Sequence, residues 1–327
     1  MKILIYSFND KIGDGLQKVS FLQEIKRIYP DSHITYTTTN TTTLKDKLNP
    51  LVQDCIDEFI ENNCITSSLK NLFKENKIFK NKYFDLIIDL QKVVIRTICL
   101  KKISHGKFFS PAAGLIFSDF RNVDNIKFKN LYIEKFYFNI LTVISKKNYP
   151  KIPEIKLPYI QKAKDLIHTI ESNNIGIAPG AGDPIRCWDF ENYLLVAKLL
   201  KKKGYNIYFF LGPNEKQFLR KCEAEGFVCP EWSNGELISR EIVFTMNLAK
   251  KMSLLLCNDG GTAWMFEFAG IKTFKIFGVT DEVKFARPGF SKTIQVKDYG
   301  FSDIKDFPVN TYMEILFNFI QKTNYKL

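Results

Sequence analysis

The first half of the chain alternates short apolar runs with segments whose apolar residues recur every three or four positions. Residues 2–7 form an apolar run that predicts a strand, and residues 16–29 show the helical spacing until Pro30 ends it. The same patterns predict strands over residues 33–37, 55–61 and 84–90 and helices over residues 67–80, 93–102 and 131–145. Strands that alternate with helices are typical of a parallel α/β sheet.

A proline-containing stretch separates this pattern from a second one like it. Residues 148–158 contain Pro150, Pro153 and Pro158, which is typical of an interdomain linker. Beyond it we predict strands over residues 174–178, 205–211, 253–257 and 273–277, and helices over residues 161–170, 190–203, 214–225, 239–252, 262–269 and 310–322. A length of 327 residues also favours two domains. We therefore predict domains at residues 1–150 and 151–327, with a terminal helix that could pack back on the first.

The clearest single unit of strand, glycine turn, helix and strand lies at residues 253–281. Its turn reads Asn258-Asp259-Gly260-Gly261, and Thr262 is the predicted N-cap of the helix. In parallel sheets ligands bind at the carboxyl ends of the strands. Two adjacent glycines allow a ligand close to the backbone, and a helix start offers N–H groups to it. The unit therefore predicts an anion or phosphate site.

The bulk composition is that of an ordinary soluble protein, with 45% hydrophobic and 25% charged residues. No apolar stretch is long enough to span a bilayer, and the first residues read as a strand rather than a signal peptide, so we expect a cytoplasmic protein. A formal charge of +12 leaves two interpretations open: a solvated lysine-rich surface, or attraction to an anionic membrane or nucleotide. Without an arginine-rich tract or a known motif, nucleic acid is not an expected partner.

Cysteine and histidine usage argues against metal or histidine chemistry. The seven cysteines form no Cys-x-x-Cys pair and read as reduced, mostly buried thiols. The three histidines are His33, His105 and His168, and none of them falls in a glycine-rich or acidic motif. We therefore expect no metal site and no cofactor.

Four stretches that each follow a predicted strand carry the candidate chemistry. The first contains Gly13-Asp14, the second spans residues 177–188, the third spans 211–215, and the fourth joins 258–261 to 277–281. At the carboxyl ends of parallel strands, all four would face one cleft between the two domains. Each stretch alone is a weak signal, and their order and spacing are more specific.

In order and spacing these stretches resemble glycosyltransferase family 9, the heptosyltransferases that build the inner core of lipopolysaccharide. The resemblance covers most of the chain, although residues 45–160 show no motif. It implies the GT-B fold, in which two Rossmann-like α/β/α domains face a central cleft. The first domain would bind the acceptor and the second the nucleotide-sugar donor. It also implies a metal-independent transfer that inverts the anomeric centre.

The resemblance also implies roles for individual residues. Gly13 and Asp14 match the family's Gly-Asp, whose aspartate is the proposed base. In the second domain Arg186 stands where the family usually has a diphosphate-binding lysine, and Glu215 matches an acid that contacts the donor's ribose. The full set of expected substrate-binding residues is Gly13, Gly180, Ala181, Gly182, Arg186, Glu215, Asp259, Gly260, Gly261, Thr262 and Trp264.

Two further positions depart from the family pattern. Gly260 replaces the usual threonine or serine, and Trp264 stands where the family has a histidine near the diphosphate. An indole donates one hydrogen bond and cannot carry a positive charge.

Glycosyl transfer needs a base for the acceptor hydroxyl, and a positioned base contributes about 10²–10⁴-fold. Asp14 could be this base or only an N-cap of the helix predicted at residues 16–29. Asp10 is the rival base.

The candidate donor residues also have plain structural interpretations. Arg186 could grip a diphosphate bidentately or form a surface salt bridge. Glu215 could bind the ribose or only charge the start of its helix. Asp259 could bind the donor or brace the glycine turn. We expect Trp188 to pack beneath its loop.

The predicted function is transfer of a sugar, expected to be a heptose from ADP-heptose, to a lipopolysaccharide core or related lipid-linked saccharide, with peripheral contact at the inner membrane. One alternative is a non-catalytic nucleotide-sugar binding or assembly protein of the same fold. A Rossmann oxidoreductase is disfavoured because no Gly-x-Gly-x-x-Gly follows the first strand.

Overall fold

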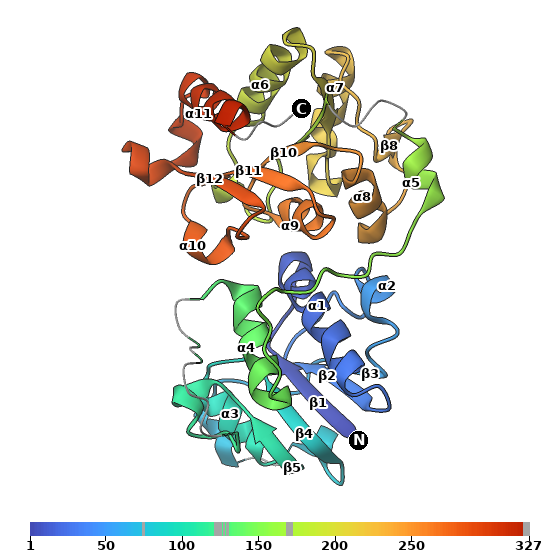
Figure 1. Cartoon of the computed structure of the whole chain (residues 1–327), viewed down its shortest axis with the longest axis vertical. Helices are drawn as coiled ribbons and strands as arrows, with labels where there is room; N and C mark the ends of the chain where they lie inside the picture. The colour runs from blue at the N-terminus through green and yellow to red at the C-terminus, as the bar shows by residue number, and fades with distance from the viewer. Residues whose placement is uncertain (74–75, 121–125, 127, 129–130, 168–172, 323–327) are drawn as a thin grey trace. The chain divides into compact units, whose positions relative to one another are not determined.

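The computed structural model describes residues 1–327 except 74–75, 121–125, 127, 129–130, 168–172 and 323–327. Its contacts divide the chain into two units, Met1–Lys156 and Leu157–Leu327 (Figure 1). The division falls within the proline-containing residues 148–158. Each unit contains a five-stranded parallel sheet, so the predicted α/β class is confirmed.

The first sheet has the order β3-β2-β1-β4-β5. Its strands are β1 (Lys2–Ser7), β2 (His33–Thr38), β3 (Glu58–Ile60), β4 (Tyr83–Asp89) and β5 (Ser104–Phe109). The α-helices described in this unit are α1 (Ile12–Ile28), α2 (Asn49–Val52), α3 (Val94–Lys101) and α4 (Ile133–Ser145). The central strand is β1, where Ile5 pairs with Tyr36 on one side and Ile88 on the other. Helices α1 and α4 pack side by side (Figure 1).

The second sheet has the order β12-β11-β10-β6-β7. Its strands are β6 (Asn174–Ala178), β7 (Asn206–Phe209), β10 (Leu254–Asn258), β11 (Lys272–Phe277) and β12 (Ser291–Gln295); β8 (Trp232–Ser233) and β9 (Glu236–Leu237) form a separate antiparallel pair. The helices are α5 (Gln161–Asp165), α6 (Phe190–Lys202), α7 (Leu219–Ala224), α8 (Ile242–Ala249), α9 (Gly261–Phe268), α10 (Glu282–Phe285) and α11 (Val309–Lys322).

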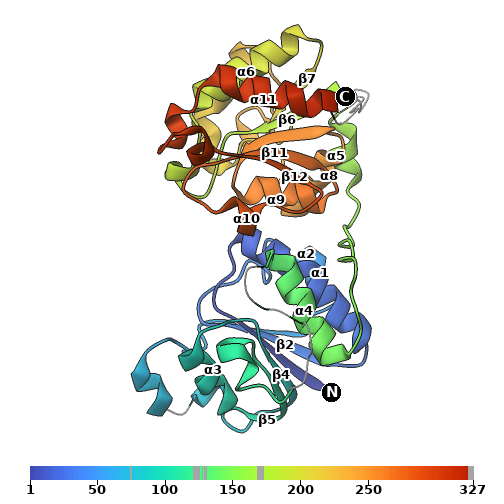
Figure 2. The same ribbon diagram turned by 60° about the vertical axis from the view of Figure 1, so that its left-hand side comes forward.

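The apolar run in β10 is continuous because both faces of this strand are covered. Leu254 and Leu256 pack in the cluster that includes α6, α7 and α11, whereas Leu255 and Cys257 pack in the cluster that includes α5, α8 and α9. Figure 2 shows the sheet of this unit between those two groups of helices. Successive side chains of a strand point to opposite faces, so the run serves two cores.

Trp188 and α11 complete one of these cores. Trp188 is buried, its Nε1 donates to the carbonyl oxygen of Phe307 at 2.9 Å, and its ring stacks on Tyr312 with centroids 4.6 Å apart. The expectation that Trp188 packs beneath its loop is confirmed. Because Tyr312 belongs to α11, the terminal helix is part of the core of the second unit.

Two predicted helix starts were wrong, and both errors fall at glycines. Helix α1 begins at Ile12 with Lys11 as its N-cap, so Asp14 lies inside the first turn and does not cap the helix. Helix α9 begins at Gly261 with Gly260 as its N-cap, so Thr262 is not the cap. Glycine has a low helix propensity and adds nothing to the apolar pattern, so the pattern alone starts these helices too late.

Other regions also differ from the prediction; strand β5, for example, was not predicted. Residues 67–80 contain two short 3₁₀-helices, Leu69–Phe73 and Lys77–Phe79, instead of one helix. Strand β12 was not predicted because its sequence is Ser-Lys-Thr-Ile-Gln, which has a single aliphatic residue. It lies at the edge of its sheet, where a strand needs little apolar surface.

A fully buried ion pair links α9 to β11 in the second unit. The Nζ atom of Lys275 lies 2.8 Å from Oε1 of Glu267, and neither side chain is exposed. The hydroxyls of Thr273 and Ser291 donate to the same carboxylate oxygen. The ammonium also lies 4.6 Å from the ring centroid of Trp264. Two charges taken out of water are tolerated only when both are paired in this way.

We predict that Lys275→Met destabilises the second unit strongly, because it leaves the carboxylate of Glu267 buried without a counter-charge. Loss of one partner of a buried pair costs about 3–5 kcal/mol, whereas replacing both partners by neutral groups is often nearly neutral. The paired variant Glu267→Gln with Lys275→Met should therefore recover most of the loss. Unfolding in denaturant measures the free energy of each variant.

The matched control is the exposed pair of Lys221 and Glu191, whose charged atoms lie 2.5 Å apart. Lys221→Ala should change the free energy of unfolding by less than about 1 kcal/mol, since solvent screens this pair. Equal losses from Lys275→Met and Lys221→Ala would contradict the prediction.

Candidate functional site

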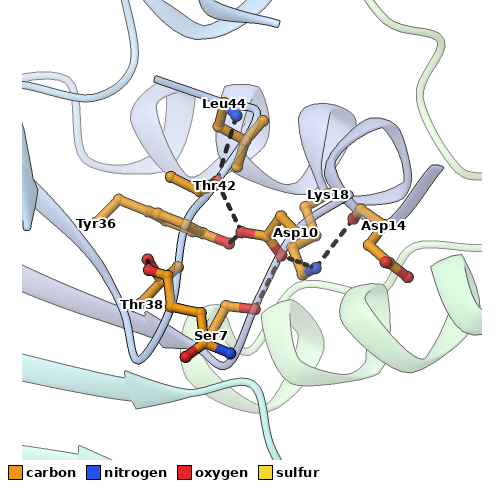
Figure 3. Close-up of polar contacts among 9 residues, drawn as sticks. Ser7, Asp10, Asp14, Lys18, Tyr36, Thr38, Thr42 and Leu44 are labelled. Carbon is orange, nitrogen blue, oxygen red and sulfur yellow. Dashed lines mark hydrogen bonds and ion pairs between the residues drawn. The ribbon is translucent and has the colours of Figure 1, made fainter. Parts of the chain in front are cut away.

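Asp14 lies in the first turn of α1, which follows the central strand β1 of the first unit. Its side chain is exposed, while Gly15 and Leu16 behind it are buried. Figure 3 shows its carboxylate pointing away from the polar cluster formed by the neighbouring residues. An exposed carboxylate at this place is accessible to an acceptor hydroxyl, as a base must be.

Asp10, the rival base, is buried and fully engaged. Its Oδ1 accepts from Lys18 Nζ at 2.5 Å and from Ser7 Oγ at 3.0 Å, and its Oδ2 accepts from Tyr36 at 2.8 Å and from Thr42 at 2.9 Å (Figure 3). Burial alone would raise the pKa of Asp10, but the charge of Lys18 and the hydrogen bonds outweigh burial and lower it. A buried, fully hydrogen-bonded carboxylate with a lowered pKa is a poor proton acceptor, which argues against Asp10 as the base.

The packing around position 15 explains why a glycine follows Asp14. A Cβ atom at this position would lie 2.6 Å from Cδ1 of Leu48 and 2.9 Å from Oγ1 of Thr43. The first turn of α1 therefore packs directly against residues 43–48. This close packing determines the position of the Asp14 backbone, from which the side chain extends.

In the second unit, the amide of Asn258 joins the two glycine loops. Asn258 ends β10 and is buried. Its Nδ2 donates to the carbonyl oxygen of Pro179 at 2.6 Å, and its Oδ1 accepts from the backbone N–H of Trp188 and the hydroxyl of Tyr193, both at 3.0 Å. The sequence pattern placed Asn258 in a turn and gave no sign of this role. An amide that both donates and accepts is the group this position needs.

The two loops touch each other at their glycines. A Cβ atom on Gly260 would lie 3.2 Å from the carbonyl oxygen of Gly180 and 3.3 Å from Cα of Ala181. The threonine or serine expected from the family pattern would therefore crowd this contact. Gly182 lies next to Arg186, since its Cβ would be 3.3 Å from Nη2. The structure thus brings these predicted residues together.

Glu215 joins the same cluster. It lies in the 3₁₀-helix Pro213–Phe218 after β7, and a Cβ atom on Gly180 would be 2.4 Å from its carboxylate. Burial raises the pKa of Glu215, and hydrogen bonds from the backbone of Gly212 and of Glu215 itself oppose the rise. No ion pair with Glu215 is found among the described residues, so this half-buried carboxylate can accept from a ligand hydroxyl.

Arg186 and Asp259 form the charged part of the cluster. Nη1 of Arg186 lies 3.6 Å from Oδ2 of Asp259; the arginine side chain is 27% exposed and the aspartate side chain 5%. Burial raises the pKa of Asp259, while the charges of Lys275 and Arg186 act to lower it. Asp259 lies on one side of the partly exposed guanidinium, so the N–H donors on its other side can bind an anion.

Three predicted residues lie on α9: Gly261, which begins the helix, Thr262 and Trp264. Thr262, in its first turn, is partly buried. Trp264 is 3% exposed, and its ring covers the ammonium of Lys275. Trp264 therefore presents little surface to a ligand and shields the buried ion pair.

The predicted residues are divided between the two units. Gly13 and Asp14 belong to the first unit, and the other predicted residues belong to the second. Across the described ranges, no group of three or more histidine, cysteine, aspartate or glutamate residues could hold a metal ion. Nor does any helix there have the length and apolarity to cross a membrane.

Comparison with solved structures finds chains that share this fold over their full length. The glycosyl transferase family 9 structure from Veillonella parvula is 17% identical, with a TM-score of 0.67, and 98% of this chain and 97% of that chain are covered. The E. coli heptosyltransferase WaaC with ADP is 14% identical, with a TM-score of 0.60 and coverage of 100% and 99%. E. coli ADP-heptose lps heptosyltransferase II is 14% identical, with a TM-score of 0.62 and coverage of 99% and 100%.

At identities this low the likeness shows the fold alone. A comparison with curated proteins gives no match. The sequence profile of glycosyltransferase family 9 (heptosyltransferase) matches residues 73–310, which is most of the chain. The resemblance seen in the sequence is confirmed: the chain belongs to glycosyltransferase family 9, has its GT-B type of α/β fold, and is a glycosyltransferase.

Proposed function

We propose that this glycosyltransferase moves a heptose from ADP-heptose to a lipopolysaccharide core or related glycan, inverting the anomeric centre without a metal ion. The observation that carries the proposal is the cluster of Arg186, Asp259 and the two glycine loops, which joins a partly exposed cation to close backbone at the start of α9. A diphosphate is the ligand that fits such a site. A relative of the same fold was solved with ADP, which makes ADP the first nucleotide to test.

In this proposal the second unit binds the donor. Arg186 donates to the diphosphate, and N–H groups at the start of α9, from Gly261 and Thr262, add to the positive field. Glu215 accepts a hydrogen bond from the ribose. Gly180, Ala181, Gly182 and Gly260 allow the donor close to the backbone. Asp259 holds Arg186, and Trp264 seals the buried pair behind them.

The first unit supplies the base in this proposal, with Gly13 leaving room beside it. The acceptor oxygen attacks the anomeric carbon as the bond to the diphosphate oxygen breaks, and the hydroxyl proton moves to Asp14. The products are the glycoside and a nucleoside diphosphate. Arg186 stabilises the charge that develops on the leaving diphosphate.

We expect ADP and ADP-heptose to raise the melting temperature of the protein more than other nucleoside diphosphates and their sugars, because a ligand of the native state stabilises it. Arg186→Ala should weaken this binding by about 1.5–3 kcal/mol, the contribution of a hydrogen bond to a charged group, or roughly 10- to 100-fold in Kd. Titration calorimetry measures the Kd.

Lys221→Ala removes an exposed cation of the same unit and should leave the Kd of ADP unchanged. Parent-like binding by Arg186→Ala would contradict the proposed diphosphate site. Binding of the donor without transfer or hydrolysis would favour the alternative of a non-catalytic binding protein.

Asp14→Asn should keep donor binding and lower the rate of transfer by about 10²–10⁴-fold, the usual contribution of a positioned base. An amide of the same shape cannot take the proton. The rate of nucleoside diphosphate release in the presence of acceptor measures the effect. Asp31→Asn changes another exposed aspartate of the first unit and should transfer at the parent rate. Full transfer by Asp14→Asn would rule out this base.

A lipid-linked acceptor would place the protein at a membrane surface, so we also propose peripheral binding to the anionic inner membrane. The formal charge of +12 supports it. Sedimentation with vesicles that contain phosphatidylglycerol should carry the protein down at low salt and release it in about 1 M salt, where screening acts within about 3 Å. Neutral vesicles are the control. Binding to both kinds of vesicle, or binding that salt does not change, would count against an electrostatic contact.

A further inference from the structure

A single ammonium group connects the two sides of the turn that carries Asp14. Nζ of Lys18 donates to Oδ1 of Asp10 at 2.5 Å and to the backbone carbonyl oxygen of Asp14 at 2.9 Å (Figure 3). Asp10 precedes α1 and Asp14 lies in its first turn. The ammonium therefore fixes the start of the helix to the chain segment that leads into it.

The anchor at Asp10 is itself rigid. Tyr36 on β2 and Thr42 beyond it hold the second carboxylate oxygen, and Ser7 at the end of β1 donates to the first. The backbone of Asp10 also bonds to residues 41 and 43. Lys18 is 3% exposed, and burial alone would lower its pKa, but the charge of Asp10 raises it. The ammonium thus stays charged, and both Asp10 and the carbonyl oxygen of Asp14 hold it.

The Asp14 carboxylate has no such support of its own. Among the described residues, no side-chain hydrogen bond or ion pair holds it, so the helix backbone decides where it lies. In a regular helix the carbonyl of Asp14 accepts the backbone N–H of Lys18, and here it accepts the side chain of the same residue as well. The extra bond is charge-assisted and partly buried, and charge-assisted hydrogen bonds are stronger than neutral ones.

We propose that Lys18 is a positioning residue for the base: from its anchor on Asp10 it holds the backbone of Asp14 so that the exposed carboxylate stays in place for proton transfer. This rests on the proposed function, in which Asp14 is the base. A base displaced by about 1 Å can lose about 10²-fold in rate, so the position of the first turn matters to kcat.

The test removes the positioning bond without leaving a buried charge. Lys18→Met alone would strand the carboxylate of Asp10, so the variant is Asp10→Asn combined with Lys18→Met, in which the methionine keeps most of the apolar stem. We expect its kcat to fall by at least about 10-fold. The KM for the donor should stay within about 2-fold of the parent value, since the proposed donor residues belong to the other unit. Circular dichroism and donor binding confirm that the variant is folded.

Tyr36→Phe is the matched control, because it removes one hydrogen bond from the same buried carboxylate and leaves the bond from Lys18 to Asp14 in place. It should lower stability but keep kcat within about 2-fold of the parent value. If Tyr36→Phe lost as much kcat as the double variant, the network would be structural only and the proposal would be overturned.

Combining these changes with Asp14→Asn separates the hypothesis that Asp14 is the base from the hypothesis that Lys18 positions it. If Lys18 acts through Asp14, the double variant should cause no further loss when Asp14→Asn is already present. A parent-like kcat for Asp10→Asn with Lys18→Met, while Asp14→Asn is inactive, would reject the role of Lys18 alone. Full transfer by Asp14→Asn would reject the base and this inference with it.

Discussion

Both units depend on the same constraint: a polar side chain buried at the carboxyl end of a central strand must find all its hydrogen-bond partners within the fold. In the first unit this side chain is Asp10, just beyond β1, and in the second it is Asn258, the last residue of β10. Each is held by groups from segments far away in the sequence. An unsatisfied buried group costs about 1–3 kcal/mol, so each residue specifies one arrangement of its surrounding loops.

The two buried groups differ in charge, and so do their consequences. Asn258 is neutral, so neutral hydrogen-bond partners in the right positions satisfy it, and it joins the loops without a cation. Asp10 is charged and needs the counter-charge of Lys18. The ammonium group of Lys18 has three N–H donors, and one of them donates to the backbone carbonyl oxygen of Asp14. The charge that stabilises the fold of the first unit is thereby coupled to the backbone of the proposed base. Asp10 and Asp14 lie close in sequence, but Asp10 is buried and paired with Lys18, whereas Asp14 is exposed.

Much of the α/β architecture was predictable from the sequence because parallel strands buried on both faces leave continuous apolar runs, as at residues 254–257. The candidate residues were found because glycines and charged side chains follow those runs, and because their order and spacing resemble glycosyltransferase family 9. Contacts that depend on tertiary structure could not be found in this way. The role of Asn258 and the approach of Glu215 to Gly180 join segments that are far apart in the sequence. The bond from Lys18 to the carbonyl oxygen of Asp14 is local, and it was missed because the predicted helix began at residue 16, beyond Asp14. Edge strand β12 and the early start of α1 were missed because they carry few apolar residues.

The tryptophan at position 264 raises the question of how the second unit compensates the charge of a diphosphate. The buried cation beneath it, Lys275, cannot supply the missing charge, because Glu267 neutralises it at 2.8 Å. The indole closes this neutral pair off from solvent and adds no cation. Among the described residues of the proposed donor site, the positive groups left are Arg186 and the start of α9. An arginine offers two parallel N–H donors where a lysine offers a point charge, so Arg186 can grip two diphosphate oxygens at once. In the proposed function the arginine and the tryptophan thus form a linked pair of departures from the family pattern. Arg186 strengthens the contact to the leaving diphosphate, and Trp264 no longer makes the contact that the family's histidine would make.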